Sequence, residues 1–311
     1  APDPRTRKRS PTAPAIHSAL LPIAPSCVAL DVAAVVGGGA AGRDGLAIAT
    51  ASGLYLWRRE GISLLDGRDW ATVAVGDLDG NGIVDVFGRN ATGSQLQVVL
   101  RSASAVTTSS MSFGAEVIRE AVAVQWNGAG GSELAIVTDA GVRVREFSTL
   151  ADLALYRRAN SESIGLAPLR MGSGSAVAWL AHLANNAVML AVLQPGVATE
   201  TLDVGSLSPS SMTAGDWNGD GFDDAVVGRA TTSVVTVLSN QRAQTGATNT
   251  FALSAVTALQ HQVATLVGNT ASTWIGDFDG DGLCDAVMPR ADLGGIVALR
   301  RGDYSNANVP I

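Results

Sequence analysis

The sequence predicts an all-β protein built from repeated units of short strands, and three observations support this. Gly accounts for 35 of the 311 residues, and hydrophobic residues (47%) far outnumber charged ones (16%), a composition typical of strands and turns. A short acidic loop recurs three times in one pattern. Short apolar runs flank each copy at similar distances, and self-similar units of this length predict a β-propeller.

The acidic loop is the clearest feature of the repeat. It reads GDLDGNGIVD at 76–85, GDWNGDGFDD at 215–224 and GDFDGDGLCD at 276–285, so all three copies fit G-D-x-[DN]-G-[DN]-G-x-x-D. One apolar run precedes each loop and two follow it. Each loop therefore connects the first and second strands of a unit.

Three further units keep the same frame but have lost acids. They lie at 33–59, 121–147 and 167–193, and the last is the most eroded and has a shortened loop. Taking the loop starts as Gly37, Asp77, Gln125, Met171, Asp216 and Asp277, the intervals are 40, 48, 46, 45 and 61 residues. These six units predict six blades, with seven as the alternative, and we interpret 239–254 as an insertion within a blade.

A blade needs four strands, and the ends of the chain decide how the ring closes. In the first unit, 62–67 can supply the fourth strand, whereas the last unit has little chain left for one. The apolar segment 15–23 precedes the first unit. We expect this N-terminal strand to complete the last blade, because closure removes sheet edges that invite pairing. The predicted organisation is a basic, Pro-rich arm at 1–15 and a single propeller at 16–311.

These loops and their flanking strands resemble the FG-GAP repeats of integrin α-chain propellers and the related bacterial VCBS-type repeats. The resemblance covers nearly the whole chain from about residue 16. It implies a propeller with calcium in the loop between the first and second strands of some blades. It implies no particular activity, because a fold does not fix a function.

The spacing within the loop independently favours calcium. Acids at positions 1, 3 and 5 converge on one point, position 7 offers a backbone carbonyl and position 9 closes the cage, while glycines at 4 and 6 permit positive φ. Oxygen ligands of this number suit Ca²⁺ better than Mg²⁺. The predicted ligands, for about three ions, are Asp77, Asp79, Asn81, the Ile83 carbonyl and Asp85; Asp216, Asn218, Asp220, the Phe222 carbonyl and Asp224; and Asp277, Asp279, Asp281, the Leu283 carbonyl and Asp285.

An alternative is that these loops are Asx-rich turns that hold their own backbone amides without a metal. The interpretation as turns is favoured for the decayed loop from Gln125 to Glu133, which lacks most of the acids. For the three full copies, several carboxylates in one loop would repel one another unless a cation neutralised them. We therefore expect a structural ion in each of these three.

The net charge and the N-terminal residues limit the classes of partner and the location that we expect for this protein. The net charge of −7 argues against nucleic acid as a partner, and no apolar run is long enough for a transmembrane helix. The first residue, Ala1, is common after signal cleavage, so we expect an exported protein that is extracellular, on the cell surface or periplasmic. The arm at 1–14 is basic, and we expect it to contact a protein partner in a larger assembly.

The sequence thus predicts a non-catalytic, calcium-stabilised propeller that serves as a protein-interaction or scaffold subunit. One alternative is a lectin-like propeller, which would show shallow aromatic pockets between blades. Another is a hydrolase or lyase with its site over the central channel. Candidate acids for that site are Asp31, Asp44, Glu60 and Asp139, although no motif connects them.

Overall fold

The computed structural model describes the strands and most turns of the chain. The described residues are 29–35, 45–58, 61–128, 130–158, 161–171, 174–185, 187–205, 209–217, 220–229, 234–238, 240, 259–262, 274–276, 285–290, 295–299 and 306–309. Among them no helix is long and apolar enough to cross a membrane.

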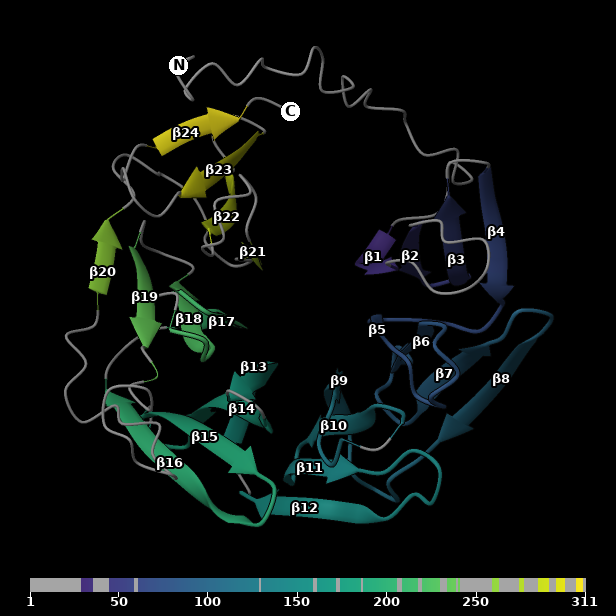
Figure 1. The fold of residues 1–311 in the computed structure, drawn as a ribbon, viewed down its shortest axis with the longest axis horizontal. Coiled ribbons are helices and arrows are strands. Elements are labelled where there is room, and N and C mark those ends of the chain that lie inside the picture. Colours follow the sequence, from purple (N-terminus) through teal and green to yellow (C-terminus); the bar gives the residue numbers. More distant parts are fainter. Residues whose placement is uncertain are drawn as a thin grey trace, which may run out of the picture.

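The described residues form six four-stranded sheets, and each sheet is an antiparallel meander in chain order (Figure 1). The first sheet holds β1 (Ala29–Val35), β2 (Gly45–Thr50), β3 (Gly53–Arg58) and β4 (Gly61–Asp66). The second holds β5 (Ala74–Gly76), β6 (Asp85–Arg89), β7 (Leu96–Arg101) and β8 (Val106–Met111). The third holds β9 (Ile118–Val124), β10 (Glu133–Thr138), β11 (Gly141–Arg145) and β12 (Asp152–Arg157).

The later sheets repeat this arrangement. The fourth holds β13 (Ser161–Met171), β14 (Gly174–Leu183), β15 (Val188–Gln194) and β16 (Val197–Gly205). The fifth holds β17 (Pro209–Gly215), β18 (Asp224–Arg229), β19 (Val234–Leu238) and β20 (Leu259–Gln262). The sixth holds β21 (Trp274–Gly276), β22 (Asp285–Arg290), β23 (Gly295–Leu299) and β24 (Asn306–Val309).

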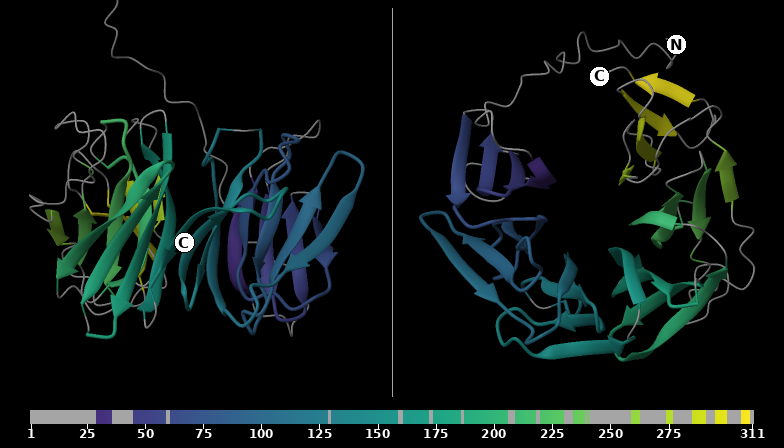
Figure 2. Two further views of the ribbon diagram at one scale, coloured as in Figure 1. Left: turned by 90° about the horizontal axis from the view of Figure 1, so that it is seen from below. Right: turned by 180° about the vertical axis from the view of Figure 1, so that it is seen from behind.

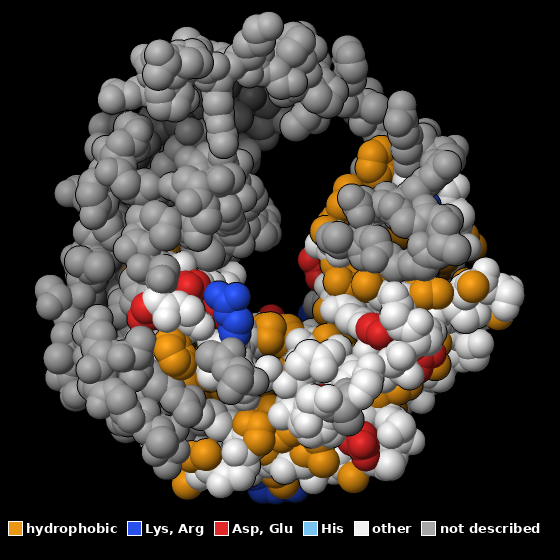
Figure 3. Space-filling view, in the orientation of Figure 1, with side chains coloured by type: hydrophobic (Ala, Val, Ile, Leu, Met, Phe, Trp, Pro, Cys, Tyr) orange, Lys and Arg blue, Asp and Glu red, His pale blue; other side chains and the backbone are white. Residues whose placement is uncertain are grey.

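The sheets follow one another around a central opening, which the space-filling view also shows (Figures 1 and 3). Seen from the side, their strands run along the axis of this ring (Figure 2). The first strand of each of the first five sheets contacts the first strand of the next sheet, so these strands line the inside. This arrangement confirms the predicted β-propeller.

Burial follows from the way the sheets stack. A middle strand has a neighbouring sheet on both faces, and every residue of β10 and of β15 is buried. Outer strands such as β8 and β12 expose most of their residues. The apolar cores accordingly lie between consecutive sheets rather than within one. Trp70, for example, packs with side chains of the first and second sheets.

The end of the chain tests one detail of the predicted ring, the strand that completes the last sheet. The prediction that 15–23 supplies the fourth strand of the last sheet is wrong, because β24 takes that place and pairs with β23. Residues 1–28, with the arm and the proposed N-terminal strand, lie outside the described residues.

The other strand predictions are confirmed. The segment 62–67 falls on β4, and the eroded fourth unit forms a complete sheet with a short connection between β13 and β14. Among the described residues, the 61-residue interval from Asp216 to Asp277 contains three strands of the fifth sheet and the first strand of the sixth. The segment 239–254, which we interpret as an insertion, lies outside the described residues except for Asn240, so this interpretation stays a prediction.

Candidate metal loops and ligand pocket

The second sheet carries a fully described acidic loop, which connects β5 to β6. Gly80 and Gly82 have φ values of +72° and +79°, the region that favours glycine. This confirms the role predicted for glycines at positions 4 and 6. Their turns bring the side chains before and after them to one side of the loop.

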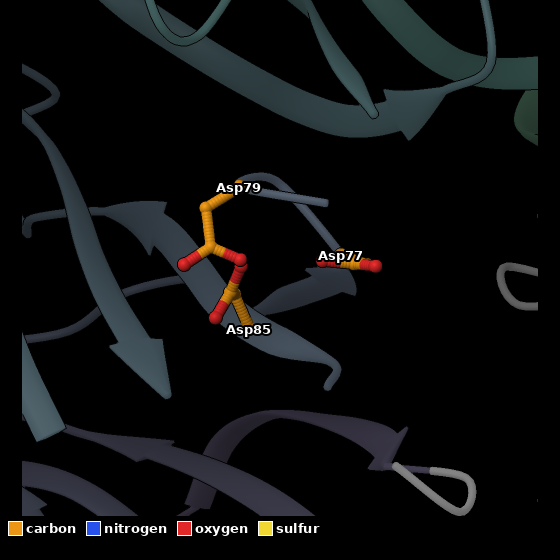
Figure 4. Close-up of side chains that lie close together, drawn as sticks. All are labelled: Asp77, Asp79 and Asp85. Atoms are coloured by element: carbon orange, nitrogen blue, oxygen red, sulfur yellow. The ribbon is translucent and has the colours of Figure 1, made fainter. Parts of the chain in front are cut away.

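Three carboxylates of this loop converge. Asp77, Asp79 and Asp85 each place an oxygen within 4.8 Å of the others, and Figure 4 shows Asp79 and Asp85 pointing toward one another with Asp77 beside them. Asp79 is exposed, Asp77 is half-buried and Asp85 is buried. Clustered carboxylate oxygens are the donors that a hard divalent cation prefers, so this triad could hold a metal ion.

Hydrogen bonds to the backbone shape the same loop. Asp77 Oδ1 accepts from the backbone N–H of Asn81 at 3.0 Å and its Oδ2 accepts from that of Gly82 at 2.8 Å. Asn81 Oδ1 accepts from the N–H of Ile83 at 2.7 Å. These bonds belong to the alternative interpretation as Asx turns. They are compatible with a bound ion because a carboxylate oxygen has more than one lone pair.

Asp85 anchors the loop to the sheet. Its Oδ2 accepts from the backbone N–H of Leu78 at 2.8 Å, and its Oδ1 accepts from that of Arg101 at 2.7 Å. Burial raises the pKa of Asp85 to about 6 against these two bonds, and the charges of Asp79 and Asp77 raise it further. A cation within the triad would offset this repulsion.

The same anchor recurs in the third and fifth sheets. Glu133 accepts from the backbone N–H of Trp126 at 2.8 Å. Asp224 accepts from the N–H of Trp217 at 3.0 Å and of Asn240 at 2.6 Å. Position 9 of the loop is thus a buried acceptor for position 2 whether or not the other acids are present. The structure adds this role to the metal-ligand role predicted for Asp85 and Asp224.

The fifth loop follows the second in its hydrogen bonds. Asp216 accepts from the backbone N–H groups of Asp220 at 3.0 Å and Gly221 at 2.8 Å, and Asp220 accepts from that of Phe222 at 3.0 Å. Asn218 lies outside the described residues. Among the described residues, the acids of this loop do not form a group with all its oxygens within 4.8 Å, as the second loop does.

A cationic side chain from the fourth sheet reaches the fifth loop. Arg170 Nη2 lies 3.6 Å from Asp216 Oδ2 and 3.7 Å from Asp223 Oδ1. The backbone of Arg170 also contacts Asp223: its N–H donates to the side-chain Oδ2 of Asp223 at 2.7 Å, and its carbonyl accepts from the Asp223 N–H at 2.9 Å. In Figure 3, basic and acidic side chains meet where the fourth and fifth sheets adjoin.

The third and sixth loops differ from the second in the acidic side chains that the structure describes. In the third loop, Gln125 Nε2 donates to Ser132 Oγ at 2.9 Å, a neutral contact in place of the acids. In the sixth loop, Asp285 begins β22. The other predicted ligands of that loop lie outside the described residues: Asp277, Asp279, Asp281 and Leu283. Their role stays a prediction, as do the carbonyl ligands Ile83 and Phe222.

A pocket opens between the second and third sheets, beside the second loop. Its volume is about 260 Å³, and it is lined by Leu78, Asp79, Gly131, Ser132, Glu133, Glu146, Phe147 and Ser148. The Ser132 N–H donates to the Asp77 carbonyl at 2.6 Å, which ties the two loops that form one wall. The turn after β11 supplies the remaining lining residues, Glu146, Phe147 and Ser148. Asp79 belongs to both the acidic triad and the pocket.

Two acidic residues lie on inner strands, and the sequence predicted only one of them, Asp31, as a candidate site residue. Asp31 of β1 accepts from the backbone N–H of Val73 at 2.8 Å. Glu120 of β9 accepts from the N–H of Leu166, and burial raises its pKa to about 7, with a smaller contribution from the charge of Asp31. Each acid therefore ties its sheet to the next. Glu120 was missed, although a charged residue in an inner strand was its signal.

Of the other acids proposed for a central site, only Asp139 is among the described residues. Asp139 lies in the β10–β11 turn, where its Oδ1 accepts from the backbone N–H of Val117 at 3.0 Å. Asp44 and Glu60 lie outside the described residues.

Comparison with known proteins identifies the fold and no family. No family model and no curated protein matches the chain. The FG-GAP and VCBS resemblance therefore stays a prediction.

Solved structures match over most of the chain. The BP39L lectin from Burkholderia pseudomallei has a TM-score of 0.65 at 14% identity, covering 90% of this chain and 83% of the lectin. The SapL1 lectin in complex with alpha methyl fucoside has 0.54 at 10%, covering 90% and 96%. BBS1N in complex with ARL6DN has 0.57 at 12%, covering 86% and 77%. At such identities these likenesses show the fold alone.

Proposed function

We propose that this chain is a non-catalytic binding propeller that takes a carbohydrate in the pocket between the second and third sheets. The observation that carries the proposal is the lining of that pocket. Asp79, Ser132, Glu146 and Ser148 have side-chain oxygen atoms that can accept hydrogen bonds, and Phe147 contributes an aromatic side chain. Pockets that combine a few polar groups with an aromatic side chain suit ligands with hydroxyls and an apolar face.

Size and charge narrow the ligand class. At about 260 Å³ the pocket is smaller than the roughly 300–1,000 Å³ of sites for drug-sized ligands, so one sugar ring fits its scale. Three of the lining residues, Asp79, Glu133 and Glu146, are acidic. Anionic sugars would be repelled, so the proposed ligand is a neutral or amino sugar whose hydroxyls donate to carboxylates. The likeness to two lectins supports this class as an analogy of fold.

Calcium has a structural part in this proposal. Asp77, Asp79 and Asp85 would hold the ion, with Asn81 of the same loop as a further oxygen ligand. The ion would bind the folded state and so stabilise it by mass action.

A glycan-binding assay with paired variants tests the proposal. The full chain is screened against immobilised glycans in calcium, and the best ligand is titrated by calorimetry. Phe147→Ala should abolish binding. Phe113→Ala is the matched control, because both side chains pack partly buried against the same core but only Phe147 lines the pocket. Equal binding by both variants, or no glycan bound by the parent chain, would reject the proposal.

Protein interaction is the second candidate. Large apolar side chains are exposed on outer strands of the first three sheets: Leu64 of β4, Val106 of β8, and Leu153 and Leu155 of β12. The likeness to BBS1N, solved in complex with ARL6DN, supports this class. Native mass spectrometry of the protein from its source distinguishes the two, since a scaffold subunit would appear in a complex of fixed stoichiometry and a lectin would not need one.

The acids Asp31 and Glu120 do not favour a hydrolase or lyase. Each holds a backbone N–H of the next sheet, which is a structural role. We therefore propose no catalytic activity.

A further inference from the structure

Arg170 lies at the repeat position directly before the loop between the first and second strands of a unit. It is the next-to-last residue of β13 and directly precedes Met171, where the fourth unit's own acidic loop would begin. The side chain is 59% exposed and extends to the neighbouring sheet, 3.6 Å from Asp216 and 3.7 Å from Asp223. A unit that has lost its own acids thus places a cation against the acids of the next one.

The equivalent position also faces the next sheet in the second sheet. Gly76 is the equivalent residue of the second sheet, and a Cβ added there would lie 2.3 Å from the Cβ of Ala123 in the third sheet. The equivalents that precede the second and sixth loops around the ring are Val36 and Gly215, which carry no charge. Of the three full acidic loops, only the fifth follows a unit with a cationic residue at this position.

The second and fifth loops therefore balance their acids differently. Asp77, Asp79 and Asp85 converge within 4.8 Å, and no ion pair to Asp77 or Asp79 occurs within the described part of the chain. The fifth loop has the same internal hydrogen bonds but a guanidinium at Asp216. A cation already beside a carboxylate repels a divalent ion and must be displaced before that oxygen can bind it.

We propose that Arg170 serves as a tethered cation that replaces the divalent ion at the fifth loop. Two loops that share the same acidic motif then differ in their need for calcium. The second binds the ion, and the fifth is neutralised by the neighbouring sheet and binds calcium weakly. This inference is independent of the ligand that the propeller takes.

Calorimetric titration of calcium into chelator-treated full-length protein tests the proposal. A parent variant, Asp79→Ala with Asp279→Ala, removes a ligand from the second and sixth loops and leaves the fifth for study. Arg170→Met is then added. The matched control is Arg157→Met, because Arg157 is similarly exposed (64%) and forms an ion pair of 3.6 Å with Glu116, away from any acidic loop.

The expected result is that Arg170→Met tightens calcium binding by at least about threefold, the scale of one exposed ion pair. Arg157→Met should leave it unchanged, and Arg170→Lys, which keeps the charge, should bind as weakly as the parent. Thermal unfolding gives a second readout, since calcium should raise the midpoint more in the Arg170→Met chain than in the parent. Equal or weaker calcium binding after Arg170→Met, or no binding in either chain, would overturn the proposal. If Arg170→Met does not fold, Arg170→Gln is judged by the same criteria.

Discussion

Replacing Glu120 by Gln should make the protein more stable at alkaline pH and leave it unchanged at acidic pH. Burial raises the pKa of Glu120 from 4.5 to about 7 in the folded state. The folded protein therefore binds a proton more tightly than the unfolded chain does. The stability due to the protonated carboxyl is fully present below pH 4.5 and is lost as pH rises toward 7.

The size of the effect follows from the shift. Each pKa unit corresponds to about 1.4 kcal/mol, so ionised Glu120 costs about 3 kcal/mol of folding free energy above pH 7. Glutamine removes this cost, and its Oε1 can still accept the N–H of Leu166. The assay is urea unfolding of both chains at pH 4.5 and pH 8 with calcium held constant. The control is Glu162→Gln, an exposed position on β13.

The test is how the difference in free energy of unfolding between Glu120→Gln and the parent chain changes with pH. Glu120→Gln should be about 3 kcal/mol more stable than the parent at pH 8 and equal to it at pH 4.5, while Glu162→Gln stays close to the parent at both. A Glu120→Gln chain that is less stable at pH 8, or shifted equally at both values, would refute the buried-carboxyl argument.

Three further predictions concern packing and metal binding. Arg143→Met should lower the free energy of unfolding, measured by heat or urea, by about 3 kcal/mol, because the Arg143 side chain is 8% exposed and pairs with Glu116. An unchanged free energy of unfolding would mean that this ion pair does not stabilise the fold. Gly80→Ala should weaken calcium binding in calorimetry, since Gly80 has φ +72° and its added Cβ would lie 2.5 Å from the Gly130 carbonyl oxygen; unchanged affinity would contradict this. Asp79→Ala should weaken calcium binding at the second loop by at least about tenfold, and unchanged binding would remove Asp79 as a ligand.

The repeat made the fold predictable. Every unit forms the same four-strand meander, so three full copies of the loop located the first and second strands of all six. Asn306–Val309, the last strand, was missed because its residues, NANV, have little strand pattern. Pairing with β23 supplies what local preference does not.

The site was predictable only in part. Spacing placed Asp77, Asp79 and Asp85 together, because all three lie within one loop whose turns the glycines fix. The contact of Arg170 with Asp216 and the pocket beside Phe147 depend on how neighbouring sheets stack. Such contacts join residues far apart in the chain, and no periodic pattern in the sequence encodes them.

A crystal structure of the full chain grown with calcium and its tightest-binding glycan tests the central claim most directly. The account predicts the sugar between the second and third sheets against Phe147, with calcium among Asp77, Asp79 and Asp85. Sugar bound elsewhere on the ring, with the pocket beside Phe147 lacking it, would contradict the account.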